Sequence, residues 1–265
     1  MKITVSRVAG VALFICLIGS VEASRAYKEY RKSVHFRPGG EVRVNNTNGQ
    51  ISVKPWDRDS VEVYAEIEVR AGNRGDAEAF MKRVEILIDR HSDRLLVEAE
   101  YPKAMGGDGL WDWIFGRKPQ VKVQFWLRVP SRTDLQLQSV NGGVHVQDVE
   151  GRASLRTTNG SVEADGMEGS VDARTVNGRI EVGLSHVDVD EEMSFHTTNG
   201  SIRLYLPEDI QADIEASTTN GSISTDFPLE VRGKFNRKRV RGRINGGGGF
   251  IDLHTVNGRI QISEE

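Results

Sequence analysis

Apolar and polar residues alternate along much of this chain, in short segments on either side of an Asn-Gly dipeptide. The apolar residues come in pairs that one mostly polar residue separates. Examples before the dipeptide are Val42/Val44, Leu135/Leu137 and Ile251/Leu253, and examples after it are Ile51/Val53, Val144/Val146 and Ile260/Ile262. A period of two is typical of a β-strand with one buried face. The pattern therefore predicts a strand, a sharp corner and a second strand, repeated along the chain.

Seven copies of a six-residue motif mark these corners. The copies are Asn46–Ile51, Ser139–Val144, Thr157–Val162, Thr175–Ile180, Thr197–Ile202, Thr218–Ile223 and Thr255–Ile260. From Asn141 to Asn220 the motif asparagines advance by 18, 18, 22 and 21 residues. Asn-Gly is favoured where a sharp corner needs a positive φ, so we expect the motif glycines to adopt that conformation.

Two all-β architectures can use this unit. Asn-Gly can close antiparallel hairpins of a meander or sandwich, or it can be one corner of a coil that stacks in parallel on the next coil. Stacking also explains the recurrent Thr and Asn, because each side chain would lie above its copy in a hydrogen-bonded ladder. We therefore favour a β-solenoid, similar to a parallel β-helix. The expected ladder consists of Asn141, Asn159, Asn177, Asn199, Asn220 and Asn257.

The run from Leu135 to Ile262, with its T-x-N-G-x-[IV]-x-[VLI] units, resembles the bacterial putative-adhesin families with Asn-Gly β-solenoid repeats. Val42–Val53 looks like an isolated first unit of the same kind. The resemblance implies an exported or envelope-associated protein. Most members of such families lack a defined biochemical activity, and the resemblance supplies no catalytic residue.

The chain divides into three parts. Residues 1–23 are predicted to be a signal peptide, residues 24–132 a β-rich N-terminal part, and residues 133–265 the repeat domain. The motif is absent from residues 54–132, where strands are expected at 61–70, 84–90, 94–101 and 121–129. A short helix is expected over Asp76–Lys82, entered through an Asp cap.

The first 23 residues carry the features of an export signal. Lys2 and Arg7 are basic, Val8–Ile18 is apolar, and Ala23 supplies a small residue before a cleavage site at Ser24. A retained membrane anchor is the alternative, but the segment is short for a bilayer. We expect cleavage, no later membrane span, and a location in the periplasm, on the cell surface or in the medium.

Bulk composition excludes several kinds of site. Cys16 is the single cysteine and lies in the predicted signal, so the mature chain has no thiolate metal site, disulfide or cysteine nucleophile. A formal net charge of −3 gives no reason to expect nucleic acid as a partner. No cofactor is expected.

Two segments outside the repeat are candidate contact sites. Trp111, Trp113 and Phe115 lie in a Gly-rich loop and could form a binding knob or, alternatively, a cap over an open sheet end. Arg237, Lys238, Arg239 and Arg241 form a basic patch that could bind an acidic envelope component. The competing interpretation of this patch is a solvated strand edge.

An enzyme is not expected. The acidic run Asp188–Glu192 is interpreted as a solvated loop, and the six histidines form no close ligand pair. His196 and His254 precede the motif Thr at equivalent outward positions, which we interpret as variation of the repeat. The favoured function is a non-enzymatic, adhesin-like or envelope-scaffold module with an unknown protein, glycan or lipid partner. The alternatives are a carbohydrate-active β-helix enzyme and a regulatory partner in envelope signalling.

Overall fold

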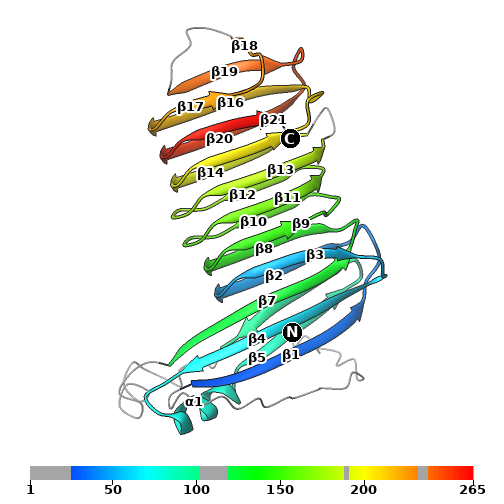
Figure 1. The fold of residues 1–265 in the computed structure, drawn as a ribbon. Helices are drawn as coiled ribbons and strands as arrows, with labels where there is room; N and C mark the ends of the chain where they lie inside the picture. Colours follow the sequence, from blue (N-terminus) through cyan, green and yellow to red (C-terminus); the bar gives the residue numbers. More distant parts are fainter. Residues whose placement is uncertain (1–24, 102–118, 188–190, 232–237, 265) are drawn as a thin grey trace, which may run out of the picture.

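The computed structural model describes residues 25–101, 119–187, 191–231 and 238–264, and within them the fold is all-β with one short helix (Figure 1). The strands form two large sheets. In spatial order the ten-stranded sheet contains β1 (Arg25–His35), β4 (Ser60–Arg70), β7 (Gln120–Pro130), β3 (Ile51–Trp56), β9 (Val144–Gln147), β11 (Val162–Glu168), β13 (Ile180–His186), β15 (Ile202–Leu206), β21 (Ile260–Glu264) and β17 (Ile223–Thr225).

The eleven-stranded sheet faces the first. In spatial order it contains β18 (Glu230–Val231), β19 (Arg239–Ile244), β16 (Ala212–Asn220), β20 (Gly249–Asn257), β14 (Met193–Asn199), β12 (Val171–Arg174), β10 (Ala153–Arg156), β8 (Asp134–Asn141), β2 (Glu41–Asn48), β6 (Arg94–Glu100) and β5 (Glu85–His91). The motif strands stack into one column, with the antiparallel N-terminal strands at one end (Figure 1).

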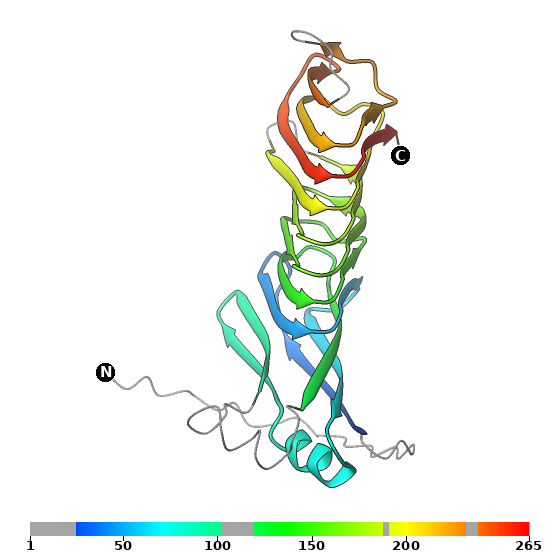
Figure 2. The same ribbon diagram turned by 90° about the vertical axis from the view of Figure 1, so that its left-hand side faces the viewer.

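Each Asn-Gly motif carries the chain from one sheet to the other. In the first 18-residue unit, β8 lies in the eleven-stranded sheet before the corner, and β9 lies in the ten-stranded sheet after it. Figure 2 shows the chain passing between the sheets at successive corners. Neighbouring units pair in parallel, so that Leu137, Leu155 and Ala173 share one register. The hairpin alternative is therefore wrong at these corners. The prediction of an all-β fold is confirmed, although the two sheets of the described chain form no closed solenoid.

The order of units in space differs from their order in the sequence. β20 pairs in parallel with both β14 and β16, and β21 pairs in parallel with both β15 and β17. The seventh motif therefore lies between the fifth and the sixth. Figure 1 shows this as the red β20 between two yellow-to-orange strands.

The core lies between the two sheets and follows from the alternation of the sequence. Inward residues such as Leu137, Leu155, Phe195 and Leu253 are fully buried, while their neighbours along each strand face solvent. Full burial of such a side chain stabilises the fold by about 1.5–3 kcal/mol. The column is thus held together by one continuous apolar interior.

The N-terminal part continues the two sheets. β2 pairs with β8 and β3 pairs with β9, so both sheets run across residue 132. β1, which the sequence analysis did not predict, pairs antiparallel with β4, which in turn pairs antiparallel with β7. The expected helix is present as α1 (Arg74–Met81), but the Asp cap is wrong. Asn73 caps the helix by accepting a hydrogen bond from the Asp76 amide at 2.9 Å, because it precedes the first helical turn.

The motif glycines do not adopt the expected positive φ, with the exception of Gly49 at +123°. They are needed instead because the units approach each other closely. An ideal Cβ on Gly178 would lie 2.5 Å from the carbonyl carbon of Gly160 and closer still to its oxygen, whereas real Cβ atoms stay beyond 3.0 Å. The other motif glycines of the column are equally crowded. The expectation of positive φ was therefore wrong for six of the seven motifs, and steric crowding is the reason for the glycine.

Candidate functional site

The motif side chains form two hydrogen-bonded columns at the corners. The Asn177 amide donates to the Asn159 side-chain oxygen at 2.8 Å, and the Asn199 amide donates to Asn177 at 2.9 Å. The same bond joins the remaining motif asparagines from Asn48 to Asn220, with Asn257 between Asn199 and Asn220. Beside this ladder, the Thr175 hydroxyl donates to the Gly160 carbonyl at 2.9 Å. These columns engage the motif Asn and the first motif Thr within the fold, which leaves the second motif position and the residue before the motif for contact with a ligand.

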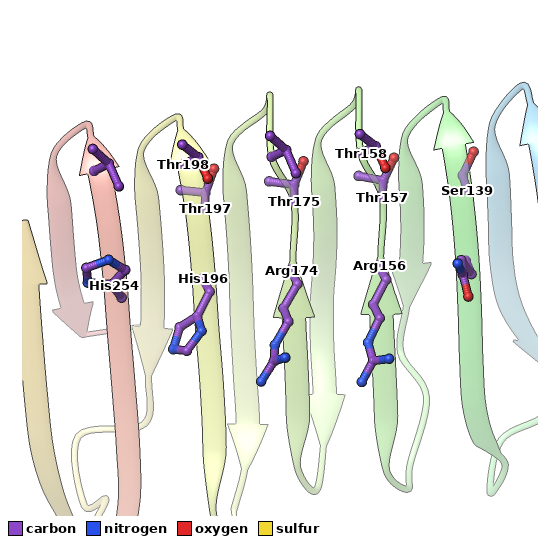
Figure 3. A pocket seen from close by; sticks show the side chains of 13 residues that line it. Ser139, Arg156, Thr157, Thr158, Arg174, Thr175, His196, Thr197, Thr198 and His254 are labelled. Carbon is purple, nitrogen blue, oxygen red and sulfur yellow. The ribbon is translucent and has the colours of Figure 1, made fainter.

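A hollow of about 430 Å³ lies on the outer face of the eleven-stranded sheet, next to the corners. Side chains on, or just after, β8, β10, β12, β14 and β20 surround it (Figure 3). Residues immediately before the motif Thr or Ser line its floor, and Thr158, Val176, Thr198 and Val256 line the side nearest the corners. The hollow thus runs across the strands, perpendicular to the chain direction.

The floor of the hollow is a single row of in-register residues. Arg156 of β10 pairs with Gln138 of β8 on one side and with Arg174 of β12 on the other. The row continues through His196 of β14 to His254 of β20. Adjacent strands lie about 4.7–4.9 Å apart, so the row presents one side chain at each such step. Two guanidinium groups and two imidazoles therefore share one narrow face.

Both histidines are held by hydrogen bonds. His196 Nε2 lies 2.8 Å from a carboxylate oxygen of Asp252, and His254 Nδ1 lies 2.9 Å from the Ser217 hydroxyl. The two rings are 6.0 Å apart between centroids in an edge-to-face arrangement. The structure thus brings together two histidines that the sequence analysis interpreted as variation of the repeat. Their shared position before the motif Thr was the available signal.

The two arginines of the row are not paired with any acid in the described chain. Arg156 and Arg174 are exposed and lie side by side, pointing in the same direction (Figure 3). Asp172, the nearest acid on the next outward row, instead accepts hydrogen bonds from the amide and hydroxyl of Ser194. These arginines were not predicted as a site, because in the sequence each is a single charged residue immediately before its motif.

Two arginines of the predicted basic patch share one acidic partner. Arg239 and Arg241 of β19 both bind the carboxylate of Glu215 on β16, at 2.8 and 2.7 Å. The hydrogen bond from Arg241 holds the pKa of Glu215 below its usual 4.5; burial acts in the opposite direction, and Arg239 adds to the lowering. Lys238 also has a partner, and Arg237 lies outside the described residues. These two arginines are thus ion-paired across neighbouring strands, and their role as a contact site stays a prediction.

Several other predicted features fall outside the structural description. Trp111, Trp113 and Phe115 are not among the described residues, and neither are the signal segment and most of the Asp188–Glu192 run. The described residues contain no cluster of three or more His, Cys, Asp or Glu side chains suited to a metal ion. Among the same residues, no helix has the length and hydrophobicity of a membrane span.

Fold and site together define an all-β repeat protein that presents rows of in-register polar side chains to solvent. The chain belongs to the Toastrack DUF4097 family, whose model matches residues 27–263. None of the curated proteins matches it.

Several solved structures are similar to this chain over most of its length, and their names describe those proteins. A putative cell adhesion protein from Clostridium sporogenes is 13% identical, with a TM-score of 0.45, and the match covers 90% of this chain and 100% of that one. A putative adhesin from Bacteroides fragilis is 9% identical, with a TM-score of 0.40 and coverage of 90% and 97%. A putative lipid binding protein from Parabacteroides distasonis is 10% identical, with a TM-score of 0.32 and coverage of 89% and 96%.

Proposed function

We propose that this protein is an exported, non-enzymatic surface-contact module of the bacterial envelope, adhesin-like or scaffold-like in action. Its column of parallel units acts as a rigid solenoid-type support. Contacts are made by side chains that the support holds in register. The observation that carries the proposal is the row from Gln138 to His254, which lines one open hollow across five neighbouring strands.

The support is suited to this role because its rigidity does not depend on the exposed row. The motif Thr and Asn hydrogen bonds lie at the corners, and the apolar core lies between the sheets. Outward residues can therefore vary without loss of the fold. Many weak contacts on such a face add up through avidity, so no deep pocket is needed.

Export is the first part of the proposal to test. The full chain would be expressed in a bacterium with its own leader, and cell fractions would be examined for the protein and its N-terminal residue. We expect a mature form that begins at Ser24 and is found outside the cytoplasm, because residues 1–23 combine a basic start with an apolar segment. An unprocessed chain that stays in the cytoplasm would contradict it.

Contact is the second part. The purified protein would be incubated with protein, lipid and polysaccharide fractions of a bacterial envelope, and bound material would be recovered and identified. A variant lacking residues 110–115 tests the aromatic loop in the same assay. Saturable recovery of one class of component supports a contact module. Recovery of nothing, together with turnover of a polysaccharide by the protein, would replace it with the carbohydrate-active alternative.

A further inference from the structure

Arg156 and Arg174 are an unusual pair for this surface. They are directly opposite on two parallel strands, and like charges in that position destabilise a sheet. Arg179 and Arg203, beside or in the ten-stranded sheet, instead share a carboxylate, that of Glu181. Arg152 and Arg259 are also exposed without a carboxylate partner in the described chain, but neither is paired in register with a second arginine. A pair that costs stability and that no acid compensates indicates a requirement other than folding.

The surroundings of the pair supply further groups for a ligand. Thr158 and Thr198 expose hydroxyls at the corner side of the hollow and make no side-chain hydrogen bond in the described chain. Between them Val176 is 43% exposed. On the far side of Arg174 the row continues with His196, whose imidazole is bound to Asp252. The hollow therefore combines cationic forks, free hydroxyls and a small apolar surface.

We propose that this hollow binds an acidic polysaccharide through the carboxylates of its sugars, with Arg156 and Arg174 as the anchoring residues. The inference names the ligand class of the contact surface and rests on the function proposed above. Each guanidinium can donate two parallel hydrogen bonds to a carboxylate, which a lysine cannot do. The free Thr hydroxyls match sugar hydroxyls, and Val176 can pack against the apolar face of a sugar ring.

A linear ligand fits this face better than a membrane does. The hollow crosses successive strands in a straight line, and its donors repeat at the strand spacing of about 4.7–4.9 Å. Binding to a lipid surface would favour large apolar side chains that insert beside the charges. Around the arginines the exposed apolar side chains are valines, Val140 and Val176. The geometry thus points to a polymer that lies along the hollow.

The test measures binding of the purified full-chain protein to alginate, a polymer of carboxylated sugars. Neutral dextran, dextran sulfate and vesicles containing phosphatidylglycerol are the comparison ligands. The double variant Arg156→Gln/Arg174→Gln removes the proposed anchor. The matched control Arg179→Gln/Arg203→Gln removes the same charge from the opposite sheet. A third protein, Arg156→Lys/Arg174→Lys, keeps the charge and loses the fork.

We expect the Gln variant of the anchor to raise the Kd for alginate about tenfold or more, since two charge-assisted contacts are lost. The control should change it less than about twofold, because its arginines are engaged elsewhere. The Lys variant should bind with intermediate affinity. Urea unfolding should show the anchor variant to be as stable as the parent or more stable, because two adjacent like charges are removed.

Four results would overturn the inference. The first two are no binding of alginate by the parent protein, and an equal loss of alginate affinity in the anchor and control variants. The other two are binding to dextran sulfate or vesicles at least as strong as to alginate, and a clear loss of stability in the anchor variant. The last result would make the arginines structural. If alginate binding fails while the protein still recovers an envelope component, the ligand class is wrong and the contact function stands. Failure of both removes the contact function.

Discussion

Replacement of Gly178 by Ala tests why each corner needs a glycine. The new Cβ would lie 2.5 Å from the carbonyl carbon of Gly160, and even closer to the oxygen that accepts the Thr175 hydroxyl. The backbone of one unit must therefore move away from the next. The Gly178 amide, which donates to the Asn199 carbonyl at 3.1 Å, would move with it.

The expected loss follows from these contacts. Overpacking of a tightly packed site costs about 1–3 kcal/mol. Weakening of the Thr175 hydrogen bond adds about 1 kcal/mol. We therefore expect Gly178→Ala to lower the free energy of unfolding by about 3 kcal/mol. Gly75→Ala is the control: that glycine lies in α1, with Asn73 Oδ1 at 3.4 Å as its nearest contact, and alanine there should leave stability unchanged or raise it by up to about 1 kcal/mol.

The assay is urea denaturation followed by circular dichroism, extended to Gly178→Asn. Asparagine tolerates positive φ better than alanine does, so it would be the milder change if backbone conformation were the reason for the glycine. Steric crowding predicts instead that Asn is at least as damaging as Ala. A loss below about 1 kcal/mol for Ala, or a well-tolerated Asn, would refute the crowding argument.

Three further changes test the corners and the β19 edge. Asn177→Ala removes two exposed ladder bonds and should lower the free energy of unfolding by about 1 kcal/mol, whereas Asn177→Gln should recover little of it because the longer side chain shifts the amide. Thr175→Val leaves the Gly160 carbonyl without its hydroxyl donor and should cost about 1–2 kcal/mol, with Thr175→Ser as the control. Because the pKa of Glu215 is lowered in the folded state, its carboxylate stabilises the fold above pH 4.5, and this contribution is lost as the pH falls through the folded pKa. Denaturation of Glu215→Gln and the parent at several pH values should therefore show the variant to be less stable at neutral pH. In strong acid the two proteins should be equally stable.

The repeat was predictable because its physical causes are local. Alternation of apolar residues determines which face is buried, and a motif that recurs every 18–22 residues brings like side chains into one column. The same periodicity predicted that Leu137 and Leu253 would be core residues, and both are fully buried. What a single motif could not reveal was the reason for its glycine, because the crowding arises only when a second unit lies against it.

The hollow and the order of the units were beyond this reasoning. Arg156 and Arg174 both precede a motif Thr, so the repeat places them side by side, but the sequence does not show that neither is paired with an acid or that a hollow lies over them. The place of β20 between β14 and β16 depends on long-range pairing that several units could satisfy equally well. β1 was missed because its partner β4 comes some thirty residues later and its own alternation is weak, with intermediate rather than buried residues along much of its length.

The interleaved seventh unit also determines the sequence of events during biosynthesis. β16 and β17 are synthesised before β20 and β21, yet the latter two strands separate them from β14 and β15. Until β20 has been made, β14 presents an unpaired edge on which β16, with its matching Thr218, can pair in the wrong place. The far end of the column therefore cannot mature unit by unit as the chain emerges. Its completion waits for a strand from the last part of the described chain, which makes the final step of folding a non-local one.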